Sequence, residues 1–419
     1  MSQNLNVTMI DTDENSFVPI QKSQRQFWGA LFVVAGTTIG AGMLALPMSV
    51  ASLGILGGTL LLTVLWGVMY FAALVALDLN IHAKIGSSIA KLSNDYMGKF
   101  AGIIGAATLV LMLNALLVAY TSGATSLIKT ITDTYTTASV NQTLIMVIFT
   151  VIMAGFVCID MKILDTGNRI FFAIMMLVFL AMMAALFGKI SITTPMLGIQ
   201  EPGVSPWLIA VPLFFTSFGF HGSIPSLINY CENRDQIIKS AFFWGSFVPL
   251  LVYVIWIVGG LSIVFTYDKS VFNKLISNEA DLGMFILSIS TVIETPWLQS
   301  FSWVFSLLAI ITSFLGVAIG LFDFYREQLT VIKNQRLISG ILALGIPLLV
   351  TLLAKETFMH VLGFAGIFLS ILAIVLPCAI WLKVKKSNDF RSLLNPNVVS
   401  ALLIIGIVVI CCEICNICF

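Results

Sequence analysis

Two glycine-rich segments inside long apolar runs hold the groups best able to bind a small molecule. The first is GTTIGAGMLALP (36–47), and the second is TSFGFHGSIPS (216–226). In each segment the glycines follow an apolar run and precede a proline, a combination that favours an interruption of a helix. Glycines in membrane helices also serve as packing surfaces, and this alternative stays open for either segment alone.

An interrupted helix leaves backbone donors and acceptors free for a ligand. N–H groups at residues 40–42 would begin the outer half-helix, where a partial positive charge suits a carboxylate. Carbonyls at residues 218–220 would suit an ammonium group, so the two segments together predict an amino acid site. The candidate residues are Thr37, Thr38, Gly40, Ala41, Gly42, Phe218, Gly219, Phe220, His221 and Gly222, with Asn114 as a polar wall residue from another span. The two phenylalanine rings are either aromatic walls of the site or plain core.

His221 is the one imidazole that this interpretation places at membrane depth. Histidine changes charge near neutral pH, and an ionisable group inside a membrane is a functional candidate by default. Three roles stay open: bracing the interruption through a hydrogen bond to a freed carbonyl, contacting the substrate, or carrying a proton.

The rest of the chain must form elements that hold these segments in a bilayer. Of the 419 residues, 59% are hydrophobic and 10% are charged, whereas soluble domains carry about 25% charged residues. Apolar blocks such as FFAIMMLVFLAMMAALFG (171–188) are long enough to span a bilayer and lack the alternation of a β-barrel. The net charge of +1 would not attract nucleic acid. The sequence therefore predicts an all-α membrane protein.

About eleven spans are predicted, at 28–51, 54–77, 100–122, 142–160, 169–188, 206–229, 240–266, 297–322, 337–354, 358–381 and 397–417. With the N-terminus inside, the outer segments hold five of the 21 Lys and Arg residues, and the other sixteen fall in inner segments. Basic residues gather on the cytoplasmic side of membrane proteins. We therefore expect a cytoplasmic N-terminus and a periplasmic C-terminus.

The interrupted segments lie in the first and the sixth span, so each begins a group of five. Paired interruptions at corresponding places in two halves point to the substrate site of a secondary transporter. Because five is odd, the second group would be inverted in the membrane. The expected organisation is a polar cytoplasmic tail (1–27), a ten-helix core (28–381) with repeats at 28–188 and 206–381, and a cytoplasmic loop followed by an eleventh helix (382–419).

Little in the sequence favours an enzyme, a cofactor, a metal or an obligate protein partner. The acids Asp78, Asp160, Asp323 and Glu413 are predicted at helix ends, and the chain has three histidines. Cys412, Cys415 and Cys418 repeat at a three-residue spacing but lie in an apolar span without a histidine. We interpret them as packed thiols and not as metal ligands.

Three segments resemble the signatures of the hydroxy/aromatic amino acid permeases: VAGTTIGAGMLALP (34–47), FTSFGFHGSIPS (215–226) and TSFLGVAIGLFDF (312–324). The resemblance covers nearly the whole chain in order. It implies a LeuT-type fold of the amino acid–polyamine–organocation superfamily. It also implies proton-driven import of an aromatic amino acid, with tyrosine favoured, across a bacterial inner membrane.

The same resemblance implies that residues 40–42 bind the carboxylate and that 218–222 form the facing wall. Thr312 and Ser313 match the place where sodium-coupled relatives bind a cation, which makes them candidates for proton coupling beside His221. Their hydroxyls are alternatively bonded to carbonyls one turn back. Some proton-coupled members carry a lysine within the fifth span, but residues 170–188 contain no ionisable group. Tryptophan or a broader aromatic range is the alternative substrate, and a non-transporting sensor or a membrane enzyme is the alternative class.

Overall fold

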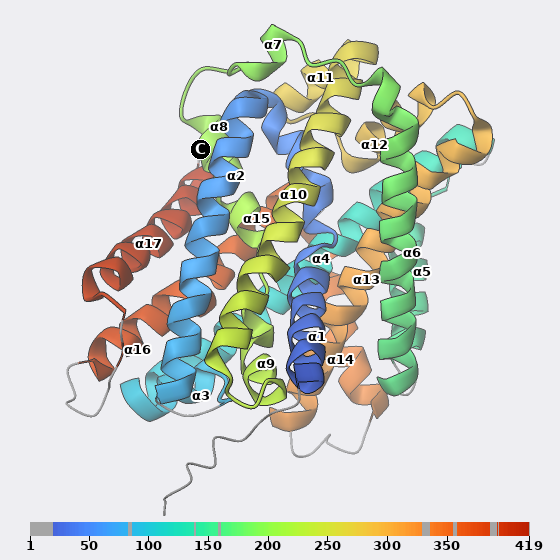
Figure 1. Ribbon diagram of the computed structural model, residues 1–419. Helices are drawn as coiled ribbons and strands as arrows, with labels where there is room; N and C mark the ends of the chain where they lie inside the picture. Colours follow the sequence, from blue (N-terminus) through green and yellow to red (C-terminus); the bar gives the residue numbers. More distant parts are fainter. Residues whose placement is uncertain are drawn as a thin grey trace, which may run out of the picture.

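The computed structural model of the protein describes residues 20–82, 86–137, 140–157, 161–328, 336–354, 358–385, 392 and 394–418. All regular structure in these residues is helical, and most of the long helices run between the same two ends of a bundle (Figure 1). Eight helices in the described residues are long and apolar enough to cross a membrane, and three shorter apolar helices accompany them. The chain is therefore an all-helical, multi-pass membrane protein.

The helices are α1 (Ile20–Thr38), α2 (Gly42–His82), α3 (Ile89–Met97), α4 (Lys99–Tyr135), α5 (Gln142–Val157), α6 (Met161–Leu186), η1 (Phe187–Lys189), α7 (Thr194–Leu197), α8 (Ser205–Thr216), η2 (His221–Ser223), α9 (Ile224–Tyr230), α10 (Asp235–Tyr267), α11 (Lys269–Ile276), α12 (Leu282–Val292), α13 (Pro296–Gln328), α14 (Arg336–Ala354), α15 (Phe358–Ser370), η4 (Ile371–Val375), α16 (Leu376–Val384) and α17 (Pro396–Cys418). We call the end of the bundle with α7 and α11 the upper end, and the end with α3 and α9 the lower end, as in Figure 1.

The first predicted span consists of two pieces, because α1 ends at Thr38 and α2 begins at Gly42. Inside α2 the chain reverses direction at Gly54, where φ is 70° and ψ is 161°. Only glycine readily adopts this backbone conformation, and an added Cβ would also overlap the carbonyl of Gly198. The loop above the reversal holds it in place, since the N–H groups of Gln200 and Glu201 donate to the Ser52 carbonyl over 2.9 and 3.2 Å. The second span then continues to His82.

The sixth predicted span is also divided, into α8 and α9 with the short 3₁₀ turn η2 just before α9. Pro225 is the second residue of α9. The N–H groups of a helix's first turn have no acceptor within the helix, so a proline, which lacks this group, is tolerated there. Pro212 lies within α8 and removes one backbone hydrogen bond near the end of that helix. The glycines and prolines that the sequence singled out therefore coincide with the interruption.

Several helix boundaries differ from those expected. α1 begins at Ile20, inside the segment assigned to the polar tail, because residues 20–27 contain no helix breaker. α4 continues to Tyr135, well past the predicted end at 122. The outer segment between the seventh and eighth spans folds into α11 and α12, and the 11 residues of α12 rise about 16 Å, too short for a bilayer core of about 30 Å. Residues 158–160 and 355–357, at two predicted span ends, lie outside the described residues.

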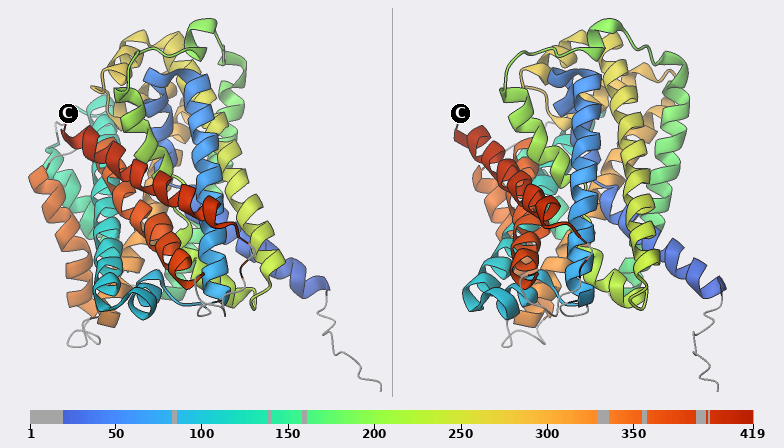
Figure 2. Two further views of the ribbon diagram at one scale, coloured as in Figure 1. Left: turned by 90° about the vertical axis from the view of Figure 1, so that its left-hand side faces the viewer. Right: turned by 60° about the vertical axis from the view of Figure 1, so that its left-hand side comes forward.

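Two helices hold the divided spans in place. α10 packs against both α1 and α2, and α15 packs against α4, α8 and α17. α17 lies obliquely on the outside of the bundle (Figure 2). Aromatic side chains fill part of the upper core, where the ring of Trp256 lies 5.3 Å from that of Phe305 and 6.1 Å from that of Phe179. Inside a bilayer such close packing, and not water exclusion, supplies most of the attraction between helices.

Candidate functional site

The two interruptions lie side by side in the structure. The hydroxyl of Ser217, the residue that follows α8, donates to the Leu213 carbonyl over 3.1 Å and lies 3.4 Å from the carbonyl oxygen of Gly42. A Cβ added to Gly42 would lie 3.3 Å from the Ser217 hydroxyl oxygen. The first residue of one half-helix therefore touches the last turn of another, although they are 175 positions apart in the sequence.

Tyr253 of α10 links the two interruptions. Its hydroxyl oxygen lies 2.6 Å from the carbonyl oxygen of Thr38, at the end of α1, and 2.8 Å from that of Ser217. The single hydroxyl proton is shared between two carbonyls that have no partner within their own helices. The side chain is fully buried, so its hydroxyl sets the spacing between the two half-helices.

Ser313 of α13 closes the first interruption from the other side. The backbone N–H of Ala41 donates to its hydroxyl oxygen over 2.8 Å. A Cβ added to Gly40 would overlap the same hydroxyl. Glycine at position 40 is therefore required for α13 to approach the backbone this closely.

The N–H groups at residues 40–42 differ in whether they have a hydrogen-bond acceptor. The N–H of Ala41 bonds to Ser313, while those of Met43 and Leu44 donate to the carbonyls of Gly40 and Ala41 over 3.1 Å. Within the described residues, no acceptor is recorded for the N–H groups of Gly40 and Gly42. Two free donors at the start of a helix can bind a carboxylate, as the sequence predicted for this segment.

The carbonyls of the second interruption also differ in whether they accept a hydrogen bond. The Phe218 carbonyl accepts from the N–H of Phe220 over 3.0 Å. The Phe220 carbonyl accepts from the N–H and the hydroxyl of Ser223 over 3.0 and 2.7 Å. Across the described part of the chain no donor is recorded for the carbonyl of Gly219, and this glycine is exposed. Of the three carbonyls proposed for an ammonium group, the one at Gly219 is therefore the free one.

The rings of Phe218 and Phe220 are core side chains in this structure. They are 0% and 1% exposed. Phe218 packs against Tyr253 with ring centroids 5.4 Å apart, and Phe220 packs against Phe242 at 5.6 Å. Of the two interpretations of these rings, the structure favours plain core.

The hydroxyls of the predicted site residues mostly bond within their own helices. Those of Thr37 and Thr38 donate to the carbonyls of Val33 and Val34 over 2.8 and 2.7 Å. The hydroxyl of Thr312 donates to Leu308 over 2.8 Å, one turn back in α13. Thr312 and Ser313 therefore divide between the two interpretations that the sequence left open.

Asn114 and Gly222 lie farther from these contacts. The side-chain amide of Asn114 donates to the Val110 carbonyl of its own helix over 2.8 Å, and its Oδ1 is buried without a partner. Gly222 is exposed, and no atom lies within 4 Å of an added Cβ. Neither residue is brought into contact with Gly42, Ser217 or Tyr253 by a recorded hydrogen bond.

His221 faces the second span. Its ring packs on Phe220 with centroids 4.9 Å apart, and the backbone of Met69 in α2 lies beside it. Both ring nitrogens are buried and make no hydrogen bond of good geometry. The imidazole is therefore positioned to brace α9 against α2 by packing, and not through the hydrogen bond to a freed carbonyl that the sequence analysis considered.

Tyr253 and Ser217 were missed by the sequence analysis, as was Tyr120 of α4. Tyr120 is buried and lies close enough to Tyr253 to interact with it electrostatically. The available signal was tyrosine itself, because the chain has eight, and two of them fall inside predicted spans three and seven, Tyr120 near the end of its span and Tyr253 in the middle. A buried tyrosine needs a partner for its hydroxyl, and an interrupted helix supplies one.

The site carries partial backbone charges and no formal ones. Lys, Arg, Asp and Glu are absent from the residues described above, and Glu413 is the only one of these types that is buried in the described chain. No group of three metal-ligating side chains occurs among the described residues. A neutral site built from N–H donors and carbonyls suits a zwitterion, which has no net charge.

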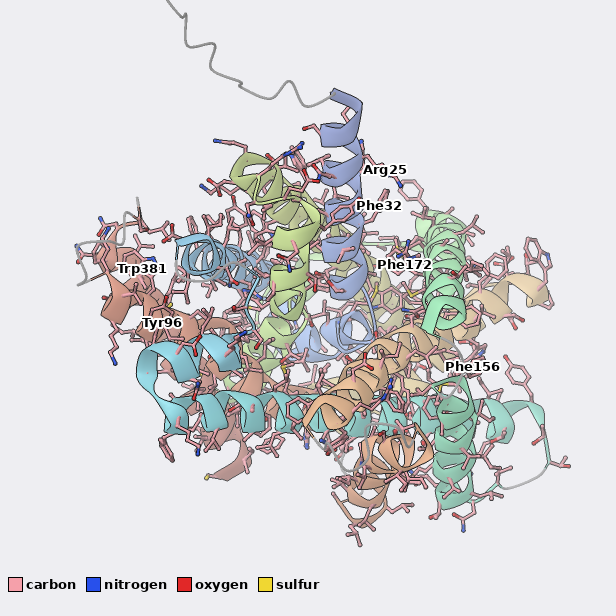
Figure 3. All side chains as sticks on the ribbon, turned by 90° about the horizontal axis from the view of Figure 1, so that it is seen from below. Arg25, Phe32, Tyr96, Phe156, Phe172 and Trp381 are labelled. Atoms are coloured by element: carbon pink, nitrogen blue, oxygen red, sulfur yellow. The ribbon has the colours of Figure 1, made fainter. Side chains whose placement is uncertain are left out.

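One face of α1 is exposed as far as the first interruption. Trp28, Phe32 and Thr37 are exposed on it. Seen from below, α1 runs from the rim of the bundle, at Arg25, toward its centre, with Phe32 in between (Figure 3). α1 packs mainly against α10 and leaves this face without a neighbouring helix of comparable contact.

Comparisons with known proteins identify the family of the chain. Residues 23–418 match the tryptophan/tyrosine permease family. The chain is 32% identical to tyrosine-specific transport system 1 of Haemophilus influenzae, over 86% of this chain and 88% of that protein. It is 27% identical to the low affinity tryptophan permease of Escherichia coli K12, over 95% and 97% of the two chains. It is 30% identical to glutamine transporter 2 of Aliivibrio fischeri, over 87% and 90%.

The family match extends over almost the whole chain and includes both interruptions, α13 and α17. The three relatives are named as a transport system, a permease and a transporter. The protein is therefore a membrane transporter and not an enzyme, and it belongs to the tryptophan/tyrosine permease family.

Proposed function

We propose that this protein is a secondary active transporter that imports an aromatic amino acid by symport with protons. L-tyrosine is the proposed substrate, ahead of tryptophan, because the relative named as tyrosine-specific is 32% identical and the relative named as a tryptophan permease is 27% identical. The observation that carries the proposal is that Tyr253 links the two interruptions, one of which leaves the N–H groups of Gly40 and Gly42 without a recorded acceptor and the other the carbonyl of Gly219 without a recorded donor among the described residues. These groups complement the carboxylate and the ammonium of an amino acid.

The proposed fold is a LeuT-type inverted repeat of five plus five spans, followed by an eleventh. Its support is that the divided helices begin the segments 28–188 and 206–381, and that they touch each other. The proposed location is the bacterial inner membrane, with the lower end cytoplasmic. The excess of Lys and Arg in the segments at that end supports this orientation.

Alternating access is proposed from features at opposite ends of the molecule. At the lower end, side chains of α1 are exposed from Trp28 to Thr37. At the upper end, a cavity of about 120 Å³ is lined by residues that include Met48, Ser122 and His360. In such a mechanism the site communicates with one side at a time.

Proton coupling is proposed on the family likeness, and three residues are its candidates from the sequence. Ser313 bonds to the backbone of the first interruption, so its hydroxyl changes partner if that segment moves. Thr312 is bonded within α13, and His221 is packed against α2. The geometry gives Ser313 the most direct connection to the proposed site.

Uptake into liposomes tests the proposal. Purified protein should accumulate labelled tyrosine against its gradient when an inward proton gradient is imposed, and an uncoupler should abolish the accumulation. Unlabelled tryptophan and glutamine are added as competitors, which separates tyrosine specificity from a broader range. If tyrosine, tryptophan and glutamine are all neither accumulated nor exchanged, the proposal is wrong, and binding without uptake would favour a sensor.

A further inference from the structure

Glu413, near the upper end of the last helix, is the buried acid that the proposed binding site does not use. It is 1% exposed and is the only buried Lys, Arg, Asp or Glu in the described chain. The sequence alone placed it at an interfacial helix end. In the structure it belongs to the face of α17 that packs on the bundle, which consists of Val399, Leu402, Gly406, Val409 and Glu413. A carboxyl therefore occupies a position where apolar packing is the rule.

The carboxyl faces Gly363 of α15. A Cβ added to Gly363 would lie 3.0 and 3.1 Å from the two carboxyl oxygens, so the glycine leaves room for them. The side-chain amide of Asn416 donates to Oε2 over 3.4 Å, and this long hydrogen bond is the only one recorded for the carboxyl in the described part of the chain.

The helices packed against α17 offer this carboxyl no cation nearby. α8 and η4 contain no ionisable residue, and α15 contains only His360, which is exposed. α17 itself carries the thiols of Cys412 and Cys415 beside Glu413. The remaining ionisable residues are those of α16 (Cys378, Lys383) and of α2 (Tyr70, Asp78, His82), with Lys383, Asp78 and His82 toward the lower ends of their helices. An unpaired carboxylate is costly in a membrane interior, so this group is suited to binding and releasing a proton.

The upper end of α17 lies close to the carboxyl along the helix. Cys418, the last residue of α17, is exposed. It lies five positions after Glu413, a rise of about 7.5 Å along the helix. Figure 2 shows this end of α17 at the surface of the bundle. The upper side is therefore the nearer side from which a proton would reach the carboxyl along α17.

α15 connects Glu413 to the second interruption. Gly366, one turn from Gly363, is pressed against the end of α8, since an added Cβ would lie 2.8 Å from the Pro212 carbonyl and 3.0 Å from the Thr216 hydroxyl. One turn further, Leu369 lies 3.2 Å from the position of a Cβ at Gly219. α15 therefore packs against both α8 and Gly219, the residue whose carbonyl belongs to the proposed site.

We propose that Glu413 is a proton-binding site, loaded from the upper side, whose protonation sets the position of α15 against the second interruption. The carboxylate takes up one proton from water to become the neutral acid, and it returns the same proton to water when the site reopens. The proposal rests on the proposed function in one respect, because it takes the linked ligand to be the transported amino acid.

Infrared difference spectroscopy tests the proton site without any substrate. Full-length protein in lipid nanodiscs is exchanged between buffers of different pH, and the carbonyl stretch of a protonated carboxylic acid is followed. The wild type should show a band that titrates, Glu413→Gln should lack it, and Glu413→Asp should retain it at a shifted frequency. Cys415→Ser, a change on the same helix, is the matched control and should show the wild-type band.

Binding of labelled tyrosine over the same pH range tests the link to the substrate. One protonation step changes affinity by at most about tenfold per pH unit. The wild type should show such a dependence, and Glu413→Gln should bind with an affinity that hardly varies. Gly363→Ala, in which a methyl displaces the carboxyl, should weaken the dependence, whereas Gly155→Ala should not, because an added Cβ there meets no atom within 4 Å.

The outcomes are distinguishable. Identical infrared spectra of wild type and Glu413→Gln would overturn the proton site, and identical pH profiles of binding would overturn its link to the substrate. A band that titrates in a protein that binds no amino acid would support the proton site while contradicting the proposed function. Should Glu413→Gln fail to fold, Glu413→Asp and Gly363→Ala supply the same comparisons.

Discussion

The hydroxyl oxygen of Ser313 accepts a hydrogen bond of 2.8 Å from the backbone N–H of Ala41, across 272 positions of sequence. This contact joins α13 to the first residues of a half-helix whose N–H groups we propose for the substrate carboxylate. A carboxylate that approaches Gly40 and Gly42 would also approach Ser313. The serine is therefore placed to sense whether the substrate is present.

Replacing Ser313 with alanine should weaken transport. The N–H of Ala41 would lose its acceptor, and leaving a buried donor without a partner costs about 1–3 kcal/mol, or a factor of about 5–150 in an equilibrium. Tyrosine affinity and initial uptake rate are measured in liposomes. Thr312→Ala is the matched control, because the Thr312 hydroxyl bonds only within α13. Equal effects of the two changes would contradict a special role for Ser313.

Gly42→Val should abolish substrate binding while the protein still inserts into the membrane. A Cβ at this position already lies 3.3 Å from the Ser217 hydroxyl, and the two additional methyl groups would fill the approach to the backbone N–H groups. Gly36→Ala is the control, since no atom lies within 4 Å of its added Cβ. Equilibrium binding and size-exclusion profiles are compared. Normal affinity in Gly42→Val would move the proposed site elsewhere.

Tyr253→Phe removes the hydroxyl that links the two interruptions and keeps the ring that packs on Phe218. Two carbonyls, those of Thr38 and Ser217, lose their shared donor, so stability should fall by about 1–3 kcal/mol. Affinity should fall as well, because the spacing of the half-helices is no longer fixed. Thermal unfolding and binding are measured beside Tyr267→Phe, whose hydroxyl lies at the exposed end of α10. An unchanged Tyr253→Phe protein would show that the link is dispensable.

His221→Gln separates the three roles of this histidine. Since the ring packs between Phe220 and the Met69 backbone, we expect bracing, so that exchange of tyrosine for tyrosine and gradient-driven accumulation fall together. Retained exchange with lost accumulation would instead assign a carried proton to His221. Both assays use the same liposomes, with and without an imposed proton gradient. Unchanged accumulation would remove His221 from the mechanism.

The number of spans predicts where reporters will be found. A reporter fused after Phe419 should appear in the periplasm, and one inserted within 383–391 should appear in the cytoplasm, because basic residues gather in the latter segment. Alkaline phosphatase and green fluorescent protein fusions report the two sides. Both reporters on the same side would show that the count of eleven is wrong by one.

The sequence predicted the interruptions well because glycine and proline act locally on the backbone. The breaks at 39–41 and 217–220 follow from residues next to them, and so does the reversal at Gly54 in part. The prediction of Ser313 came from a resemblance, and the structure gives it a contact with Ala41. Local signals of this kind need no knowledge of which helices meet.

Contacts between distant segments were harder to predict. Tyr253 reaches carbonyls 215 and 36 positions away, and a tyrosine in a span is equally compatible with simple packing. Phe218 and Phe220 were candidates because they flank Gly219, yet their rings turn into the core. The sequence places Glu413 near the end of the last span, and this depth predicts an interfacial position. Whether its side chain lies on the buried or the exposed face of α17 depends on how this helix packs against the bundle.

Residues 43–53 are joined to the second span by the reversal at Gly54, and the carbonyl of Ser52 is held by two N–H groups of the loop above it. Most of their side chains are buried, whereas α1 has an open face and packs mainly on α10. The first span thus consists of an anchored half, residues 43–53, and a less enclosed half, α1, which residues 39–41 connect. A ligand bound at the connecting residues would stay in place if α1 rotated about them. If the proposed alternating access uses this division, small angular changes of α1 would change access to the site while the amino acid bound there stays nearly stationary.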